Sequence, residues 1–436
     1  MSDSNFNKQA ERIPHLIIFT ETEACPFMNR ELPYLKMAFD LITIFPIRKL
    51  DSTTSTIRKH ITNSVNLDGS FADFINNLGT KIIFLLNAVS RPSTYKEIWR
   101  CSRDAAIIPS MRRVLIDSAF FLATDYWLRK KMYLQNSDKI APIFYGFWFA
   151  PYTYALANFA EKNSATCIAR AHGYDIYLER TEVNFFPFRE KAVRKIDHVF
   201  VASEAGTKYL QKSWPNYRSK FSCSYLGVDD PKLRNPENST NEIHIVSCSN
   251  IVDVKRVPLI AEVLILLIHR DPSLALTWTH IGDGPQMGQV KRALQGATEY
   301  SLNSKLIGRK SKEDIESIYS KVPIDLFINL STTEGGAPVS IMEVMSYGIP
   351  VLATQVGGNP EIVDSKTGEL VPVDADLEYI VKRISLMLAN KSDLNSKREL
   401  SHEKWKNNFN SEINYPIFIN SVIEIFANKK NLNKFK

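Results

Sequence analysis

A glycine loop between two glutamates is the segment of this sequence best suited to bind a phosphorylated ligand. The segment comprises Glu334, Gly335, Gly336, Ala337, Pro338, Val339 and, four residues further on, Glu343. Glycines let backbone N–H groups approach a phosphate, and a helix beginning near Pro338 would add the partial positive charge of its N-terminus. Inside that helix, the Glu343 carboxylate could accept hydrogen bonds from a ribose diol. An ordinary strand–turn–helix with a solvent-facing glutamate fits the same pattern equally well.

Two adjacent cations follow an apolar run earlier in the chain. Lys255 and Arg256 follow the apolar run 243–247, and Asn250 lies between that run and the two cations. A diphosphate carries about two negative charges, which two cations and a helix N-terminus can balance without a metal ion. No Asp-x-Asp motif is placed to hold a metal beside a diphosphate, so we expect no metal and no other cofactor. Taken alone, the pair is better explained as an ordinary surface Lys–Arg pair.

His172 is a third candidate, because it follows an apolar run (165–170) typical of a buried strand. An imidazole at the end of a strand can hold a hydroxyl group. A lone histidine is more often structural, so this residue gains weight only from its context.

The elements that would position these residues alternate along both halves of the chain. Strands are predicted at 15–20, 41–45, 81–86, 143–149, 165–170, 198–202, 243–247, 275–281, 324–329 and 350–353, and helices at 110–135, 258–270, 311–321, 339–347 and 414–428. This alternation predicts an α/β fold with parallel sheets covered by helices. Ligands would collect at the carboxyl ends of the strands, in a cleft between two domains.

The polar, Pro-rich segment 230–241 separates the halves and is typical of a linker. We therefore predict two domains, at 1–232 and 233–412. Residues 413–436 are predicted to form a C-terminal helix that packs back toward the N-terminal domain.

The glycine loop resembles the donor-binding signature of the retaining glycosyltransferases of family 4, which have the GT-B fold of two facing Rossmann-like domains. Motif order supports the resemblance through the C-terminal half, at 281–285, 334–343, 357–363 and 367–370. In one respect the sequence departs from the family, because eight residues instead of seven separate the glutamates. Either Glu334 reaches the sugar through a one-residue bulge, or the amides of Gly335 to Ala337 make that contact.

The resemblance implies that domain 1–232 binds the acceptor and that domain 233–412 binds the nucleotide sugar. It also implies roles for the candidate residues. Lys255 matches the lysine that binds the donor diphosphate, while Asn250 stands where the family has an arginine, a charge that Arg256 could replace. Gly284 lies in the matching Ile281–Pro285 loop, and His172 matches the histidine that contacts the donor sugar at its reacting face. His172, Lys255 and Glu334 are thus the predicted catalytic residues. Arg170, Asp175 and Arg189 are weaker candidates for the acceptor side.

By the same resemblance, the chain is expected to be a hexosyltransferase. It would move a sugar from a UDP- or GDP-linked donor to a lipid-linked glycan with retention of configuration, in capsule or O-antigen synthesis. The alternative is a catalytically weak or inactive binding or regulatory subunit, favoured by Asn250 and the displaced Glu334. A sugar phosphorylase or nucleotide-sugar epimerase on a similar fold is a further rival.

The net charge of +7 lies wholly in residues 1–230, which carry 30 Lys and Arg against 23 Asp and Glu. An anionic partner on that half would explain it, although scattered surface charge would too. The basic residues Arg112, Arg113, Arg129, Lys130 and Lys131 beside Phe120, Phe121, Tyr126, Trp127 and Leu128 could meet an anionic membrane. The alternative is a helix packed on its own sheet with a basic outer face. Nucleic acid is an unlikely partner for a chain whose C-terminal half is neutral.

Five widely spaced cysteines form no C-x-x-C motif and indicate free thiols in a reducing compartment. No signal peptide is recognised, and the uncharged run 140–160 is interpreted as a buried strand and a helix start instead of a membrane span. We expect a bacterial cytoplasmic protein, peripheral at the inner face of the cell membrane.

Overall fold

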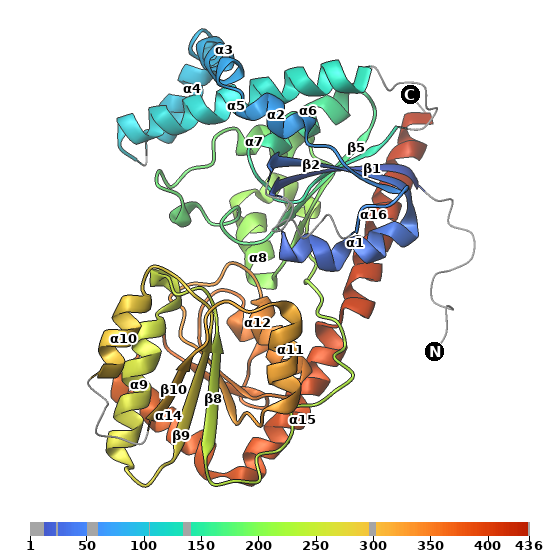
Figure 1. Ribbon diagram of the computed structural model, residues 1–436. Coiled ribbons are helices and arrows are strands. Elements are labelled where there is room, and N and C mark those ends of the chain that lie inside the picture. The colour runs from blue at the N-terminus through green and yellow to red at the C-terminus, as the bar shows by residue number, and fades with distance from the viewer. Residues whose placement is uncertain are drawn as a thin grey trace. The chain divides into compact units, whose positions relative to one another are not determined.

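The computed structural model describes residues 13–22, 25–49, 60–103, 105–133, 141–295 and 302–434, which form two compact units (Figure 1). Unit 1 comprises Met1–Ser224 with Tyr415–Lys436, and unit 2 comprises Tyr225–Asn414. The structural boundaries therefore fall at 224/225 and 414/415, against the predicted 232/233 and 412/413.

Unit 1 is built on a seven-stranded parallel sheet of order β3-β2-β1-β4-β5-β6-β7. Its strands are β1 (Ile13–Thr22), β2 (Phe39–Arg48), β3 (Val65–Leu67), β4 (Ile143–Gly146), β5 (Thr166–Ala171), β6 (His198–Val201) and β7 (Phe221–Cys223). Its helices are α1 (Pro26–Ala38), α2 (Ser70–Asn76), α3 (Leu78–Val89), α4 (Pro92–Cys101), α5 (Ile107–Tyr133), α6 (Tyr152–Lys162), α7 (Arg189–Lys195), α8 (Glu204–Ser213) and most of α16 (Ser411–Lys434).

Alternate side chains of β1 enter two separate cores, so both faces of this sheet are covered. Ile17 and Phe19 belong to one core, with Trp127 of α5 and Tyr152 of α6. On the opposite face, Leu16 and Ile18 join α1 and α16. A strand buried on both faces reads as a continuous apolar run, which is why β1 was recognisable in the sequence.

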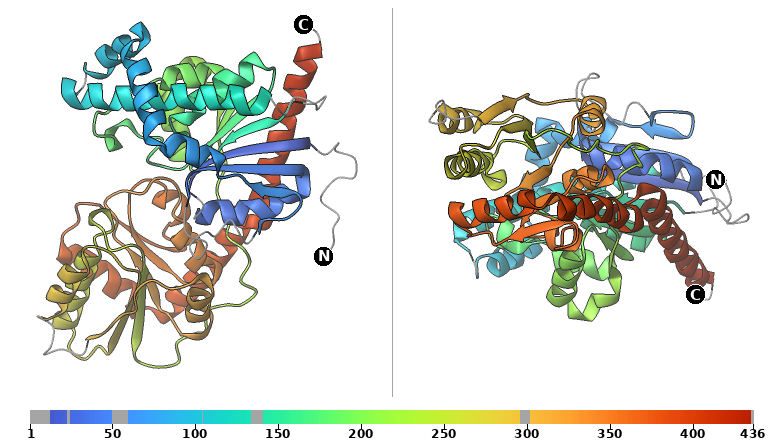
Figure 2. Two further views of the ribbon diagram at one scale, coloured as in Figure 1. Left: turned by 45° about the horizontal axis from the view of Figure 1, so that its top comes forward. Right: turned by 90° about the horizontal axis from the view of Figure 1, so that it is seen from below.

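Unit 2 carries a six-stranded parallel sheet of order β10-β9-β8-β11-β12-β13. Its strands are β8 (Ile243–Cys248), β9 (Leu276–Ile281), β10 (Leu302–Leu306), β11 (Leu326–Asn329), β12 (Val351–Thr354) and β13 (Gly368–Val371). Its helices are α9 (Val257–Arg270), α10 (Met287–Gln295), α11 (Lys312–Lys321), α12 (Val339–Ser346), α13 (Asn359–Ile362), α14 (Leu377–Ala389) and α15 (Lys391–Asn408). Figure 2 shows these helices lying along the sheet from two further directions.

Both sheets have the doubly wound order, in which the chain builds outward from a central strand in one direction and then in the other. The reversal lies between β1 and β4 in unit 1 and between β8 and β11 in unit 2. Loops at the carboxyl ends of these strand pairs diverge and leave a crevice, the usual ligand site of such sheets. The predicted α/β class with two parallel sheets is confirmed.

One predicted strand is wrong, because residues 81–86 belong to helix α3. The Asn77 side chain caps this helix by accepting a hydrogen bond from the Thr80 backbone N–H at 3.1 Å. A short apolar run has no period that separates a buried strand from a helix, so only the cap and the packing decide. The third strand of the sheet is instead β3.

Helix α16 brings the end of the chain onto the unit 1 sheet. Phe418, Ile419 and Val422 are buried among the residues of β1, β2 and α1. Farther along, the Lys429 ammonium forms a 2.7 Å ion pair with Asp197, the residue before β6. None of the helices in the described ranges is sufficiently long and apolar to cross a membrane.

Candidate functional site

Two loops meet at the switch point of the unit 2 sheet. One follows β8 and the other follows β11, and the Thr332 backbone N–H donates to the Val254 carbonyl at 2.8 Å. The predicted donor residues lie on these loops and on α12, which the second loop enters, except for Gly284, which lies on the loop after β9. The structure thus gathers residues from 250–256 and 334–343 at the carboxyl edge of one sheet.

Lys255 and Glu334 form the central contact of this edge. The Lys255 ammonium lies 2.5 Å from Glu334 Oε1, and the Asn329 amide donates to the same oxygen at 3.2 Å. The Glu334 side chain is 9% exposed and that of Lys255 is 24% exposed. An ion pair this sheltered is screened less by solvent than a surface pair. Despite its one-residue offset, Glu334 therefore turns its carboxylate to the cation of the neighbouring loop.

Close backbone contacts lock the loops of this edge together. Gly357, with φ of +53°, follows β12, and a Cβ built on it would lie 2.1 Å from the Glu334 carbonyl oxygen. Similarly, a Cβ on Gly284 would lie 2.4 Å from the Ile251 carbonyl oxygen. Only glycine fits such approaches. These two glycines therefore set the positions of the Glu334 and Lys255 loops.

The amides of the glycine loop remain available to a ligand. Among the described residues, the N–H groups of Gly335, Gly336 and Ala337 donate to no protein acceptor. Pro338 precedes α12 without a side-chain cap, so the Val339 end of the helix also presents unpaired amides. Together these groups form a concentration of donors beside Lys255, suited to an anion.

Two backbone carbonyls hold the Arg256 guanidinium in place. Its Nε donates to the Leu330 carbonyl at 2.6 Å and its Nη1 to the Val373 carbonyl at 2.8 Å. Burial lowers the pKa of its guanidinium. Arg256 therefore joins the ends of β11 and β13. The predicted replacement of the missing arginine charge gains no support from this geometry, and Asn250 itself is exposed.

Glu343 lies on α12 toward β8 and α11, partly buried. Burial, together with the Glu343 charge, raises the pKa of the Cys248 thiol to about 12. Tyr319 and Tyr347 also lie within the electrostatic reach of Glu343. Glu343 therefore lies close to Cys248, at the end of β8, and to Tyr319 of α11.

In unit 1, His172 lies at the end of β5, close to the switch point of its sheet. Its Nε2 lies 3.0 Å from the Phe147 carbonyl after β4, and its ring stacks on Phe27 with centroids 5.6 Å apart. Burial, with the charge of Arg170, lowers the pKa of His172 to about 3. The ring is therefore neutral at physiological pH. With Nε2 donating to the carbonyl, Nδ1 is an acceptor, and it is buried with no partner in the described structure.

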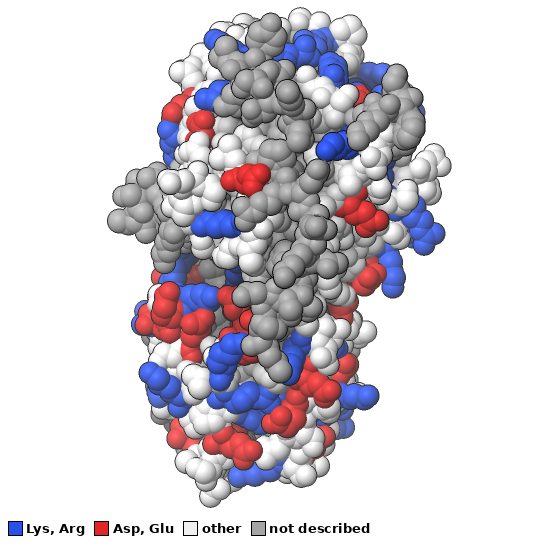
Figure 3. Space-filling view, turned by 90° about the vertical axis from the view of Figure 1, so that its right-hand side faces the viewer, with Lys and Arg blue, Asp and Glu red and all other residues white. Residues whose placement is uncertain are grey.

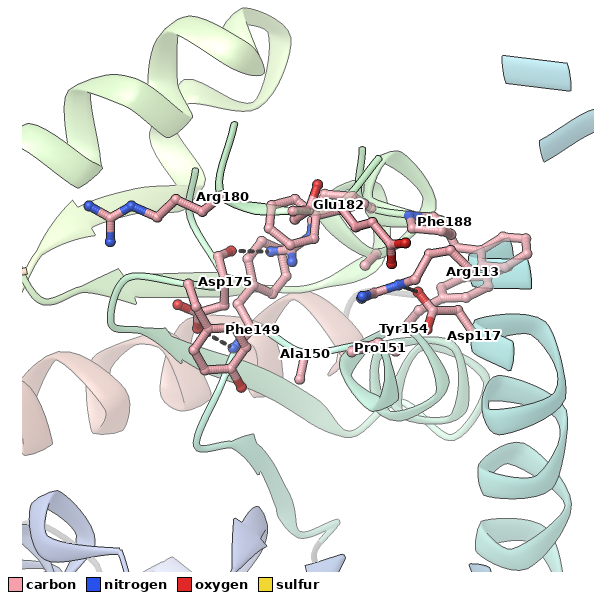
Figure 4. Close-up of a pocket in the computed structure, with 16 residues that line it drawn as sticks. Arg113, Asp117, Phe149, Ala150, Pro151, Tyr154, Asp175, Arg180, Glu182 and Phe188 are labelled. Atoms are coloured by element: carbon pink, nitrogen blue, oxygen red, sulfur yellow. Dashed lines mark hydrogen bonds and ion pairs between the residues drawn. The ribbon is translucent and has the colours of Figure 1, made fainter. Parts of the chain in front are cut away.

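Two of the three predicted acceptor-side residues line one pocket beside α6, with a volume of about 210 Å³ (Figure 4). Asp175 accepts hydrogen bonds from the backbone N–H groups of Phe149, His172 and Gly173 at 2.8–2.9 Å. Arg189 stacks on Phe149, with its guanidinium carbon 3.8 Å from the ring centre. Arg113 and Asp117, one turn apart on α5, form a 2.9 Å ion pair that lines the same pocket. The pocket is therefore lined by aromatic rings and charged groups, a combination suited to a polar ring.

The third acceptor-side candidate, Arg170, lies elsewhere. It is fully buried, pairs with Glu31 of α1 at 3.1 Å and packs on the Phe418 ring of α16 at 4.3 Å. The Tyr145 hydroxyl donates to Glu31 at 2.8 Å. These contacts tie α1 and α16 to the sheet, so Arg170 supports the fold and does not face the pocket.

On α5, the structure decides where the aromatic residues point. Trp127 and Leu128 are buried in the core, and Phe120 and Phe121 pack against it, while Tyr126 is exposed. Of the predicted basic residues, Arg113, Arg129 and Lys131 pair with Asp117, Asp125 and Asp68, whereas Arg112 and Lys130 are exposed. The aromatic side of α5 therefore packs on its own sheet.

Residues 242–390, which carry the Lys255–Glu334 edge, match the family model described as "Glycosyl transferases group 1". These residues are similar to that family. The match lies within unit 2 and spans the six strands of its sheet. The predicted resemblance to glycosyltransferases is confirmed.

Two curated relatives carry names that agree with this match. The putative colanic acid biosynthesis glycosyltransferase WcaL of Escherichia coli (strain K12) is 24% identical over 56% of this chain and 60% of its own length. The amylovoran biosynthesis glycosyltransferase AmsK of Erwinia amylovora is 23% identical over 45% of this chain and 49% of its own. The chain thus spans about half the length of the curated relatives it matches.

Solved structures extend the similarity of fold to both units. Anabaena Alr3699/HepE in complex with UDP has a TM-score of 0.65 at 13% identity, over 94% of this chain and 99% of its own. The lipopolysaccharide outer core galactosyltransferase WaaB has a TM-score of 0.62 at 12% identity, over 96% and 99%. At such identities the likeness concerns the fold, and the predicted GT-B class is confirmed.

Sequence reasoning missed Asn329, which orients the Glu334 carboxylate. It also missed Arg113, Asp117 and Tyr154, which line the pocket of unit 1. Asn329 ends a buried strand, where a polar side chain after three apolar residues is the available signal. The pocket residues come from helices and gave no such signal.

Proposed function

We propose that the chain is a glycosyltransferase that moves a sugar from a nucleotide-sugar donor to a glycan acceptor in polysaccharide synthesis. The Lys255–Glu334 pair at the switch point, beside unpaired loop amides, is the observation that carries this proposal. The match of residues 242–390 to a glycosyltransferase family and the polysaccharide-synthesis names of the relatives support it. The solved neighbour that holds UDP supports a UDP-linked donor, with a GDP-linked one as the alternative.

The proposed reaction replaces the bond from the anomeric carbon to the donor phosphate oxygen with one to an acceptor hydroxyl oxygen, on the same face of the sugar. The hydroxyl proton passes to the departing phosphate oxygen. Lys255 and the amides of Gly335 to Ala337 stabilise the diphosphate charge as it develops, and such preorganised groups commonly provide a large part of catalysis. We assign this stabilisation to the chain alone, with no metal.

The remaining roles follow the same scheme. Glu343 is proposed to bind the nucleotide ribose, and Glu334 the donor sugar once a diphosphate has taken the Lys255 ammonium. The His172 Nδ1, a buried acceptor, would receive a sugar hydroxyl after a local opening. The Asp175–Arg189 pocket of unit 1 has room for a single sugar ring of the acceptor. The acceptor is proposed to be lipid-linked, which places the chain at the inner face of the cell membrane.

A thermal-shift panel of UDP, GDP and ADP tests the donor site. A nucleotide that binds the folded protein raises its melting temperature by mass action, by an amount equivalent to about 2.7 kcal/mol at a hundredfold excess over the dissociation constant. We expect UDP or GDP to raise it in the wild type and to raise it less in Glu343→Ala. The UDP-linked and GDP-linked sugars are tested in the same way. If neither the nucleotides nor these sugars raise the melting temperature, the proposal is contradicted.

A further inference from the structure

Exposed apolar side chains gather on three helices of unit 1. Of the 23 large apolar side chains that are exposed among the described residues, 13 lie between residues 78 and 126. They are Leu78, Ile82, Ile83, Leu85, Leu86 and Val89 of α3, Tyr95 and Trp99 of α4, and Ile107, Ile108, Met111, Ile116 and Tyr126 of α5. We call this set the outer helical surface. Soluble monomers rarely leave so much apolar surface open, so the outer helical surface needs a partner.

Helix α3 shows the imbalance most clearly. Of its twelve residues, Ala88 is the one recorded as buried, while Leu86 is 66% exposed and Ile83 is 57% exposed. Phe84 packs toward α5, with its ring centroid 5.6 Å from that of Tyr126. Figures 1 and 2 show α3 and α4 lying beside α5, on its side away from the strands. The exposed apolar residues of α3 are therefore not needed for the core of unit 1, against which Phe84 packs.

Basic residues accompany this apolar surface. Residues 78–131 contain ten Lys and Arg and four Asp and Glu, a net charge of +6 out of +7 for the whole chain. Three of these acids are engaged inside the unit: Glu97 is buried, Asp117 pairs with Arg113, and Asp125 pairs with Arg129. The fourth, Asp104, lies outside the described residues. Exposed basic residues on these helices are Lys81 of α3, Lys96 of α4 and, on α5, Arg112, Arg129 and Lys130, and the exposed Arg91 and Arg103 flank α4. By contrast, both signs of charge are interspersed over the face of unit 2 seen in Figure 3.

We propose that the outer helical surface binds the surface of an anionic phospholipid bilayer. Apolar helix residues enter the boundary between headgroups and acyl chains, while lysine and arginine attract anionic lipids. Trp99 and Tyr95, half exposed, are of the kind enriched at that boundary, and the Arg103 guanidinium lies 4.0 Å from the Trp99 ring centre. This inference rests on the proposed membrane association and names the surface responsible, without depending on the donor chemistry.

The charge argues against two other occupants. Self-association through a two-fold axis would bring the same +6 segment against itself, at an electrostatic cost. A protein partner usually meets an interface whose centre is depleted of lysine, whereas Lys81 lies in the middle of the α3 apolar side chains. An anionic bilayer, by contrast, attracts the positive charge and also accepts a lysine among apolar side chains.

Vesicle flotation of the full chain tests the proposal. We compare vesicles of phosphatidylcholine alone with vesicles that also contain phosphatidylglycerol. The wild type should float with the anionic vesicles, less in high salt, and weakly with the neutral ones. The double variant Ile83→Gln/Leu86→Gln should lose about tenfold or more in lipid partitioning, because two buried apolar chains are removed. Lys81→Gln should lose about fivefold, as expected for one lysine near an anionic surface.

Matched variants on unit 2 control for general surface effects. Leu386→Gln removes a side chain that is 53% exposed, and Lys291→Gln removes an exposed cation. Both should float like the wild type. Equal flotation of Ile83→Gln/Leu86→Gln and wild type, no flotation of the wild type, or a concentration-dependent dimer that the double variant abolishes would each overturn the proposal. The rise in melting temperature with UDP is measured for every variant as well. A variant that loses flotation but keeps this rise has an intact donor site, so the two proposals are tested separately.

Discussion

Lys255 and Glu334 connect the two loops that flank the switch point of the unit 2 sheet, through an ion pair of 2.5 Å. In the ligand-free chain, the Glu334 carboxylate occupies the position beside Lys255 where an anionic ligand would compete. Binding of a diphosphate therefore exchanges one anion for another, and the two residues should respond to mutation in opposite directions.

Lys255→Met should weaken nucleotide diphosphate binding. The lost charge-assisted hydrogen bond corresponds to about 1.5–3 kcal/mol, or roughly ten- to a hundredfold in the dissociation constant. Isothermal titration with UDP or GDP measures this, and Lys291→Met is the matched control for an exposed lysine of the same unit. Unchanged affinity in Lys255→Met would remove Lys255 from the donor site.

Glu334→Gln should bind the nucleotide diphosphate a few-fold more tightly while turning over the sugar nucleotide more slowly. Removing the competing carboxylate frees Lys255 for the phosphates, whereas the sugar loses its proposed anionic partner. Titration with the nucleotide and turnover of the sugar nucleotide are measured on the same preparation. If affinity and turnover both fall, Glu334 has a structural role instead.

The buried histidines should make the fold sensitive to acid. Burial lowers the pKa of His172 to about 3 and those of His198 and His280 to about 4. Below the ordinary histidine pKa of about 6.5, the unfolded chain takes up protons that the folded chain does not, so stability falls as the pH drops toward 4. Each such histidine removes about 1.4 kcal/mol per pH unit in this window.

Melting temperatures between pH 7 and pH 4 check this expectation. His172→Gln should melt lower than the wild type at pH 7 but lose less on acidification, because it no longer contributes to proton uptake. A variant that parallels the wild type at every pH would exclude a depressed pKa for His172.

Arg170→Met should be strongly destabilising, by about 3–5 kcal/mol, because it leaves the Glu31 carboxylate buried without its cation. The double variant Glu31→Leu/Arg170→Met should recover most of the loss, since an apolar replacement of both partners is often close to neutral. Urea unfolding measures the three free energies of unfolding. If Arg170→Met and the double variant are equally stable, the Glu31 carboxylate is not left buried and charged in Arg170→Met, and the prediction is wrong.

Much of the fold could be predicted, because its strands are apolar on both faces and its helices carry local end signals. Ser203 and Ser311, a residue type typical of helix starts, cap α8 and α11. Gly348 ends α12 with φ of +77°, as a glycine after a helix suggests. The run 81–86 was misassigned, because its exposed apolar residues imitate a buried strand.

From the sequence alone came the resemblance to glycosyltransferases, the α/β class, the neutral charge of the C-terminal half, and the loops on which Lys255 and Glu334 lie. Tertiary structure decided what those side chains contact. The sequence offers two adjacent cations as equals, yet Arg256 turns to the Leu330 and Val373 carbonyls while Lys255 reaches Glu334. The physical reason is distance along the chain: Glu334 is 79 residues from Lys255, and only the winding of the sheet brings their loops to one edge.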